Sequence, residues 1–155
     1  LERKLMEREV DLALTDGPIE HPLLESCLVF TQHLRLVAPA HVASVAAIDW
    51  ASTDVLLFNT DCFYRSVFES WMKKNRVTPR RIQTIESYQV IFACVRAGLG
   101  VCCSPDVMLP APHAQGLHVM TPPDLPEAPV YCVWRRDGAT PLLMRLVDHL
   151  RGQTA

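Results

Sequence analysis

The middle of the chain alternates between short apolar runs and longer stretches with helical periodicity. The run Val55-Leu56-Leu57-Phe58 is apolar throughout and shows no polar alternation, which is typical of a strand buried on both faces. The stretch after it places apolar side chains at the spacing of one helical face. Strands joined by helices run parallel through right-handed crossovers, so this order predicts an α/β fold. The predicted elements are strands at 55–58, 81–85 and 100–104 and helices at 63–74 and 87–98.

The composition is that of an ordinary globular protein and excludes several functions. The 155 residues are 49% hydrophobic and 21% charged, which suits one compact domain or two small lobes. A net charge of −2 argues against DNA binding by this segment itself, because binding to phosphates needs a concentrated basic surface. The sequence contains no bilayer-spanning apolar run and no signal peptide, so we expect a cytoplasmic protein without a membrane partner.

The six cysteines point to reduced thiols rather than to a metal centre. None forms a CxxC pair, and no histidine pair has the spacing of a zinc site, so we expect no metal and no other cofactor. A disulfide between the adjacent Cys102 and Cys103 would strain the peptide between them and is not expected. The histidines are scattered along the chain and form no recognisable catalytic set.

The polar loop after residues 55–58 is the candidate site that local sequence suggests. Thr60 or Asp61 is predicted to cap the following helix by accepting a backbone hydrogen bond. A strand that feeds a helix through a short loop places free N–H groups and a positive dipole end at the sheet edge, where anions bind. The same loop carries Cys62, a thiol that a helix N-terminus could acidify. From the local sequence alone, this loop is a ligand-binding site, a site with a reactive cysteine, or a loop that only packs against the core.

The flanking regions supply further strands and a final helix. Trp71 and Trp134 are expected in the core, and Thr140-Pro141 opens the last helix as cap and first helical residue. Residues 108–129 are rich in proline and are expected to be connecting chain with one short strand. The remaining predictions are a helix end at 1–8, strands at 10–14, 23–30, 34–38, 117–120 and 130–135, and a short helix near 48–51.

Five segments in this order resemble the effector-binding domain of LysR-type transcriptional regulators. They are VDLALTDGPIEHPLL, LRLVAPAHV, VLLFNTDCFYRSVFESWM, RIQTIESYQVIFACVRAGLGVCCSP and VYCVWRRDG, and the resemblance covers essentially the whole chain. It implies a type II periplasmic-binding-protein fold of two Rossmann-like α/β lobes with mixed, mostly parallel sheets. By this resemblance, residues 1–38 with 126–155 form one lobe, which lacks its first strand, and residues 39–125 form the other.

The resemblance also implies a function. A small molecule, expected to be an organic anion, would bind in the cleft between the lobes of a protein that is not an enzyme. Family members pair as homodimers or tetramers and bind DNA through an N-terminal helix-turn-helix, which is absent from this sequence. The effector-binding residues implied are Thr15, Asp16, Thr60, Asp61, Cys62, Phe63, Tyr64, Ser87 and Ser104. Two of these residues also have a structural interpretation: Thr15 as a turn former and Ser87 as a helix cap.

Three other functions compete with this interpretation. A periplasmic-type solute-binding protein has the same architecture. Peroxide-sensing members of the family carry a reactive cysteine at the position of Cys62, where Arg65 could add positive charge, but the following segment here holds no resolving cysteine. An enzyme with Cys62 as nucleophile would need a base, and no histidine lies near it in sequence.

Overall fold

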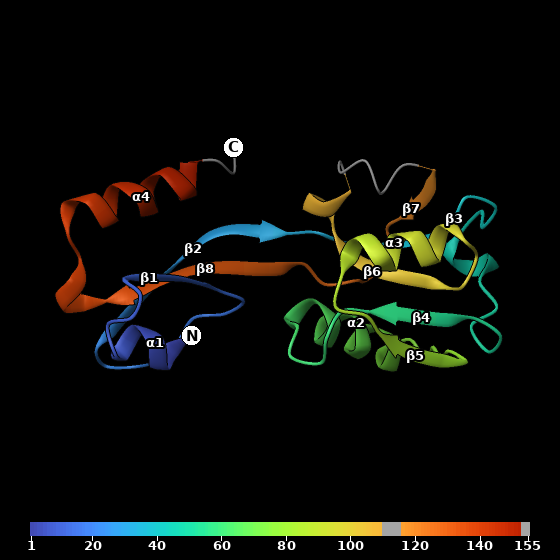
Figure 1. Cartoon of the computed structure of the whole chain (residues 1–155), viewed down its shortest axis with the longest axis horizontal. Helices are drawn as coiled ribbons and strands as arrows, with labels where there is room; N and C mark the ends of the chain where they lie inside the picture. Colours follow the sequence, from blue (N-terminus) through green and yellow to red (C-terminus); the bar gives the residue numbers. More distant parts are fainter. Residues whose placement is uncertain (110–115, 153–155) are drawn as a thin grey trace. The chain divides into compact units, whose positions relative to one another are not determined.

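The computed structural model describes residues 1–109 and 116–152. The chain divides into two compact units, one built from Leu1–Gln32 together with the chain from Ala128 onward, the other from His33–Glu127. The sequence placed the boundaries after residue 38 and before residue 126. The structure assigns residues 34–39 to the second unit because this strand pairs with two strands of that unit. Figure 1 shows the helices and strands of both units, coloured along the sequence.

The second unit is an α/β sandwich around a mixed sheet. Among the described residues its strands form a five-stranded sheet in the order β5-β4-β6-β3-β7. Strand β4 runs parallel to β5 and to β6, which confirms the parallel strands predicted from the sequence, whereas β3 is antiparallel to β6 and β7. The elements are β3 (Leu34–Pro39), η1 (Val45–Ala47), β4 (Asp54–Leu57), α2 (Phe63–Lys74), β5 (Arg81–Thr84), α3 (Tyr88–Arg96), β6 (Val101–Pro105), η2 (Asp106–Met108) and β7 (Leu117–Met120).

Helices α2 and α3 cover opposite faces of this sheet (Figure 1). Val55 and Leu57 pack with Trp71 and other side chains of α2, while Leu56 packs with the α3 side chains. Every residue of β4 is buried, which explains why its sequence shows no polar alternation. Trp71 is 3% exposed, as expected of a core residue, and its Nε1 donates to the Pro123 carbonyl at 2.9 Å.

The first unit is an antiparallel sheet covered by helices. Its strands follow the order β1-β8-β2, with β8 in the centre. Helix α4 packs on the face that carries Val130, Cys132 and Trp134, so Trp134 is a core residue as predicted. Leu5 of α1 packs with Val133 on the other face. The elements are α1 (Glu2–Met6), β1 (Leu12–Thr15), β2 (Leu24–Gln32), β8 (Ala128–Arg135), η4 (Arg136–Gly138) and α4 (Pro141–Gly152).

Some predicted elements were wrong in position or type. The short helix expected near 48–51 is instead a 3-10 turn at Val45–Ala47. Strand β6 does not end at Ser104 but includes Pro105, because β3 pairs alongside it and matches Leu34 with Pro105. In the described ranges, antiparallel pairings outnumber the two parallel ones, so both α/β units are less parallel than expected.

Candidate functional site

Three loops of the second unit meet at one edge of its sheet. Because β5, β4 and β6 are parallel, the loops that follow them leave the sheet on the same side. We call this side the carboxyl edge: residues 58–64 after β4, 85–88 after β5, and the end of β6 at Ser104–Pro105. The topology therefore brings together the predicted residues Thr60, Asp61, Cys62, Phe63, Tyr64, Ser87 and Ser104 at one edge.

The first turn of α2 lacks the side-chain cap that the sequence predicted. Cys62, not Thr60 or Asp61, occupies the N-cap position with an extended backbone (φ −81°, ψ 122°). Within the described residues, its side chain makes no capping hydrogen bond, and Thr60 and Asp61 are exposed in the loop. Tight turning of the loop explains this, since the Cys62 N–H donates to the Asn59 carbonyl at 3.2 Å. The helix thus presents its positive end without a competing side-chain oxygen.

Arg65 fastens this loop to the neighbouring strand ends. Its Nη1 donates to the Phe58 carbonyl at 3.0 Å and to the Thr84 hydroxyl at 2.8 Å, and its Nε donates to Glu69 at 2.8 Å. The guanidinium joins the ends of β4 and β5 to α2. Sequence reasoning treated Arg65 only as a charge near Cys62. The four-residue spacing of Arg65 and Glu69 on a helix was the signal that could have indicated its structural role.

An aromatic pair stands beside the loop. The rings of Phe58 and Tyr88 are stacked with centroids 5.1 Å apart and an interplanar angle of 5°. Burial raises the pKa of Tyr88 well above its ordinary value, and Cys62 is the next largest influence, followed by the Cys103 thiol. Tyr88 begins α3 and therefore lies on the carboxyl edge, as Cys62 does. The loop is apolar on this side and polar at the exposed residues Thr60 and Asp61.

The two serines of this edge already have local partners. Ser87 caps α3 as predicted, accepting from the Val90 N–H at 3.4 Å and donating to the Gln89 Oε1 at 3.0 Å. Ser104 is fully buried within β6, and its hydroxyl donates to the Pro105 carbonyl at 3.1 Å. A ligand contact through the Ser104 hydroxyl would need a rearrangement of that bond.

Thr15 and Asp16 belong to the first unit. Thr15 ends β1, pairs with Tyr131 of β8, and donates from its hydroxyl to the Gly17 carbonyl at 2.6 Å, which is the turn-forming role. Asp16 follows it and is exposed. Their participation with the carboxyl edge in one binding site stays a prediction.

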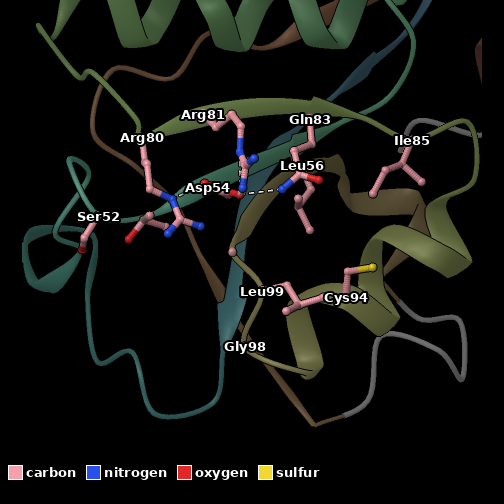
Figure 2. A pocket seen from close by; sticks show the side chains of 12 residues that line it. Ser52, Asp54, Leu56, Arg80, Arg81, Gln83, Ile85, Cys94, Gly98 and Leu99 are labelled. Carbon is pink, nitrogen blue, oxygen red and sulfur yellow. Dashed lines mark hydrogen bonds and ion pairs between the residues drawn. The ribbon is translucent and has the colours of Figure 1, made fainter.

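The opposite edge of the same sheet holds an ion cluster that the sequence analysis missed. A cavity of about 370 Å³ opens at the amino ends of the parallel strands (Figure 2). Asp54, the first residue of β4, lies in it with a side chain only 1% exposed. Its carboxylate accepts from Arg80 Nε at 2.6 Å, Arg81 Nη2 at 3.0 Å and Gln83 Nε2 at 2.5 Å. The hydrogen bond from Arg80 is the main reason why the pKa of Asp54 lies far below its ordinary range. We call this side the amino edge.

Known proteins resemble this architecture. The family model of the LysR substrate binding domain matches residues 1–155. The chain belongs to the LysR substrate-binding domain family. The Bacillus subtilis regulator CzcR, an HTH-type transcriptional regulator, is 35% identical to this LysR domain over 104 residues, which cover 67% of the chain and 35% of CzcR. The Bacillus subtilis regulator YusT is 30% identical over 125 residues, covering 81% of the chain and 41% of YusT. The matched part of the LysR domain thus spans about a third of the length of CzcR.

Solved structures of LysR effector domains share the fold. The BenM effector-binding domain with its effector benzoate has a TM-score of 0.79 at 16% identity, covering 98% of this chain and 72% of that one. The regulatory domain of CcmR from Synechocystis PCC6803 in complex with 2-PG has a TM-score of 0.80 at 15% identity, covering 99% of this chain and 77% of that one. This likeness confirms the type II periplasmic-binding-protein fold expected from the sequence.

The thiols of the LysR domain are all unbonded in the structure. Burial raises the pKa of Cys102 and of Cys103 well above the ordinary thiol value, so neither supplies a thiolate readily at neutral pH. Among the residues that the structure describes, no three His, Cys, Asp or Glu side chains gather as a metal site would require, and no helix is long and apolar enough to cross a membrane.

Proposed function

We propose that the chain is the ligand-sensing effector domain of a LysR-type, DNA-binding transcriptional regulator, and that it binds a small organic anion at the carboxyl edge. The observation that carries this proposal is the family match across all 155 residues. The named relatives are transcriptional regulators, which favours this function over a transport protein or an enzyme.

The anionic character of the ligand rests on the start of α2. A helix N-terminus concentrates partial positive charge and unpaired N–H donors, and here the Cys62 side chain does not occupy them in the described structure. Arg65 holds the loop in place through Phe58 and Thr84, so the donors are preorganised. The stacked Phe58 and Tyr88 offer an apolar wall for the rest of the molecule. In this proposal Thr15, Asp16, Thr60, Asp61, Cys62, Phe63, Tyr64, Ser87 and Ser104 form the effector site.

The regulatory output follows from differential binding. An effector that binds one arrangement of the two units more tightly than another shifts their populations by that difference in affinity. In the parent regulator this shift would reach DNA through a helix-turn-helix segment and a homodimeric or tetrameric assembly. The fold neighbour CbnR, a LysR-family regulator, has a full-length structure in complex with its target DNA, which supports this arrangement.

The test starts with a panel of small aliphatic and aromatic carboxylates in a thermal-shift assay on the chain. A one-site ligand at 100 times its Kd adds about 2.7 kcal/mol of stability. The decisive variant is Cys62→Asp, which places a carboxylate at the N-cap. It should stabilise α2 by about 1 kcal/mol, because the new carboxylate accepts hydrogen bonds from the free N–H groups at the start of the helix. It should also weaken binding of an anionic hit at least tenfold, because those N–H groups are then occupied and the carboxylate repels the anion.

Cys62→Ala is the matched control, since it alters the same side chain without adding charge or a hydrogen-bond acceptor. It should keep the affinity within about threefold of the parent chain. Binding that is unchanged in Cys62→Asp would overturn the anion site at this helix. A panel hit recovered as a converted product would instead favour an enzyme.

A further inference from the structure

Two cysteines of the first unit face each other across neighbouring strands. The register of β2 and β8 places Cys27 directly opposite Cys132. Directly opposed residues of an antiparallel pair have Cα atoms about 4.5–5.5 Å apart and side chains on the same face. A disulfide needs Cα atoms about 4.4–6.8 Å apart. The backbone therefore already holds these two thiols within the range that a disulfide spans.

The other thiols lack this arrangement. Cys102 and Cys103 are opposite Val37 and Leu36 of β3, and their side chains point to opposite faces of the sheet. In the strand pairings that the structure describes, Cys27 and Cys132 are the one cysteine pair in register. Both are free thiols and lie in the cluster beneath α4, with Cys132 fully buried and Cys27 half-buried.

We propose that Cys27 and Cys132 are a redox-active dithiol that closes to a cross-strand disulfide by exchange with a low-molecular-weight disulfide. This inference is independent of the effector site. The Cys27 thiolate attacks one sulfur of the small disulfide, and the first small thiolate leaves. The Cys132 thiolate then attacks the Cys27 sulfur, the internal disulfide forms, and the second small thiolate leaves. The two thiol protons end on the two released small thiols, and two electrons pass from the protein to the reagent.

The surroundings assign the first step to Cys27. Its half-buried side chain is reachable, whereas Cys132 is enclosed. Burial raises the pKa of both thiols. From α4, Arg151 lowers the pKa of Cys27 and Asp148 raises it, while Cys27 itself raises the pKa of Cys132. Since only the thiolate reacts, exchange is slow at neutral pH and quickens as pH rises.

The bond would join the strands that connect the two units. The chain passes from β2 into the second unit after Gln32, and returns from that unit into β8 at Ala128. The β2 ladder also shifts register between Leu28 and Phe30, directly after Cys27. A covalent link at this point would fix the pairing register of β2 and β8, which the irregularity weakens. It would also close a long loop and so reduce the conformational entropy of the unfolded chain.

The experiment incubates the chain in mixtures of reduced and oxidised glutathione, quenches it by alkylation, and maps peptides without reduction. The expected product is a peptide pair joined through Cys27 and Cys132, with a yield that rises with the oxidised fraction. Its rate of formation should increase severalfold between pH 7 and about pH 8.5. The oxidised chain should melt several degrees higher than the reduced chain.

Cys27→Ser should abolish both the cross-link and the rise in Tm, and Cys132→Ala should stop the reaction at the glutathione adduct of Cys27. Cys62→Ser is the control and should form the same cross-linked pair. The proposal is overturned if Cys27 and Cys132 are both still alkylated under conditions that oxidise other thiols, or if the disulfide joins a different pair. The mapping of the parent chain decides this even where a variant fails to fold.

Discussion

The two edges of the five-stranded sheet handle polar groups in opposite ways. At the amino edge, the buried Asp54 carboxylate accepts hydrogen bonds from three side chains, so its own oxygens are satisfied within the protein. At the carboxyl edge, α2 begins at Cys62 without a side-chain cap, and Thr60 and Asp61 lie exposed in the loop. The cavity volume alone would favour the amino edge as the binding site.

This difference distinguishes polar groups that stabilise the domain from polar groups that are open to a ligand. A charged group whose partners come from its own sheet stabilises the fold and has little left to offer a ligand. Backbone donors left open beside a preorganised loop are what an anion requires. We therefore expect substitutions at the amino edge to change stability and substitutions at the carboxyl edge to change affinity.

The largest effect is expected from Asp54→Asn. The change leaves Arg80 and Arg81 without their carboxylate partner, and Tm should fall by about 10 °C at neutral pH while anion affinity measured below Tm is kept. If anion affinity measured below Tm also falls in Asp54→Asn, the amino edge takes part in binding and the proposed difference between the two edges is wrong.

The pH dependence of this difference has a definite sign. The pKa of Asp54 is lowered in the folded state, so its stabilisation is present above the unfolded value of about 3.9 and is lost as pH falls toward the folded value. The gap in Tm between the parent chain and Asp54→Asn should therefore narrow below about pH 5. A gap that widens on acidification would contradict this account.

Gly100→Ala should come next in size and act on the same edge. A Cβ at this position would lie 2.3 Å from the Asp54 carbonyl oxygen, which is backbone and cannot rotate away. We expect a loss of about 2 kcal/mol in the free energy of unfolding, measured by denaturant titration. Gly17→Ala is the control, because nothing lies within 4 Å of its added Cβ and the change should be near neutral.

Arg65→Met should sharpen the comparison from the carboxyl edge. It removes the bonds to Phe58, Thr84 and Glu69, which costs about 1–2 kcal/mol of stability. Because the loop loses its brace, affinity for an anionic ligand should fall at least tenfold in calorimetric titration. If the loss of affinity is no larger than the loss of stability explains, Arg65 is not required to position the loop for binding.

The smallest effect is expected from Cys62→Ser. A serine at the N-cap supplies a hydroxyl acceptor that the thiol does not, so the free energy of unfolding should rise by less than about 1 kcal/mol. If peroxide sensing were the function, the parent chain and this variant would differ in a peroxide-dependent readout such as oligomeric state. We expect no such difference, and its appearance would restore Cys62 as a sensor.

The sequence predicted those parts of the fold that depend on local patterns. The apolar run 55–58 and the periodic stretch after it were sufficient for β4, α2 and the parallel pairing, because both signals come from adjacent residues. The cap of α2 was mispredicted because residue preference favoured Thr60 or Asp61, whereas the turn at Asn59 set the helix start.

Features that depend on distant pairing were out of reach. Strand β6 includes Pro105, which was expected to end it, because β3, far earlier in the chain, pairs beside it. The Asp54 cluster draws its donors from Arg80, Arg81 and Gln83, more than two dozen residues further on. The opposition of Cys27 and Cys132 likewise follows from register, which a single strand sequence does not reveal.

The order of strands in the first unit bears on how the chain is made. Strand β8 lies between β1 and β2, yet the ribosome adds it only after the whole second unit. At the usual rate of synthesis that interval is on the order of 10 s. During it, β1 and β2 lack β8, the strand with which both pair in the described sheet, and the edges that β8 later covers are open to other chains. The continuous second unit can fold in this time, so premature release or stalling near residue 127 would leave an aggregation-prone nascent segment beside an already folded body.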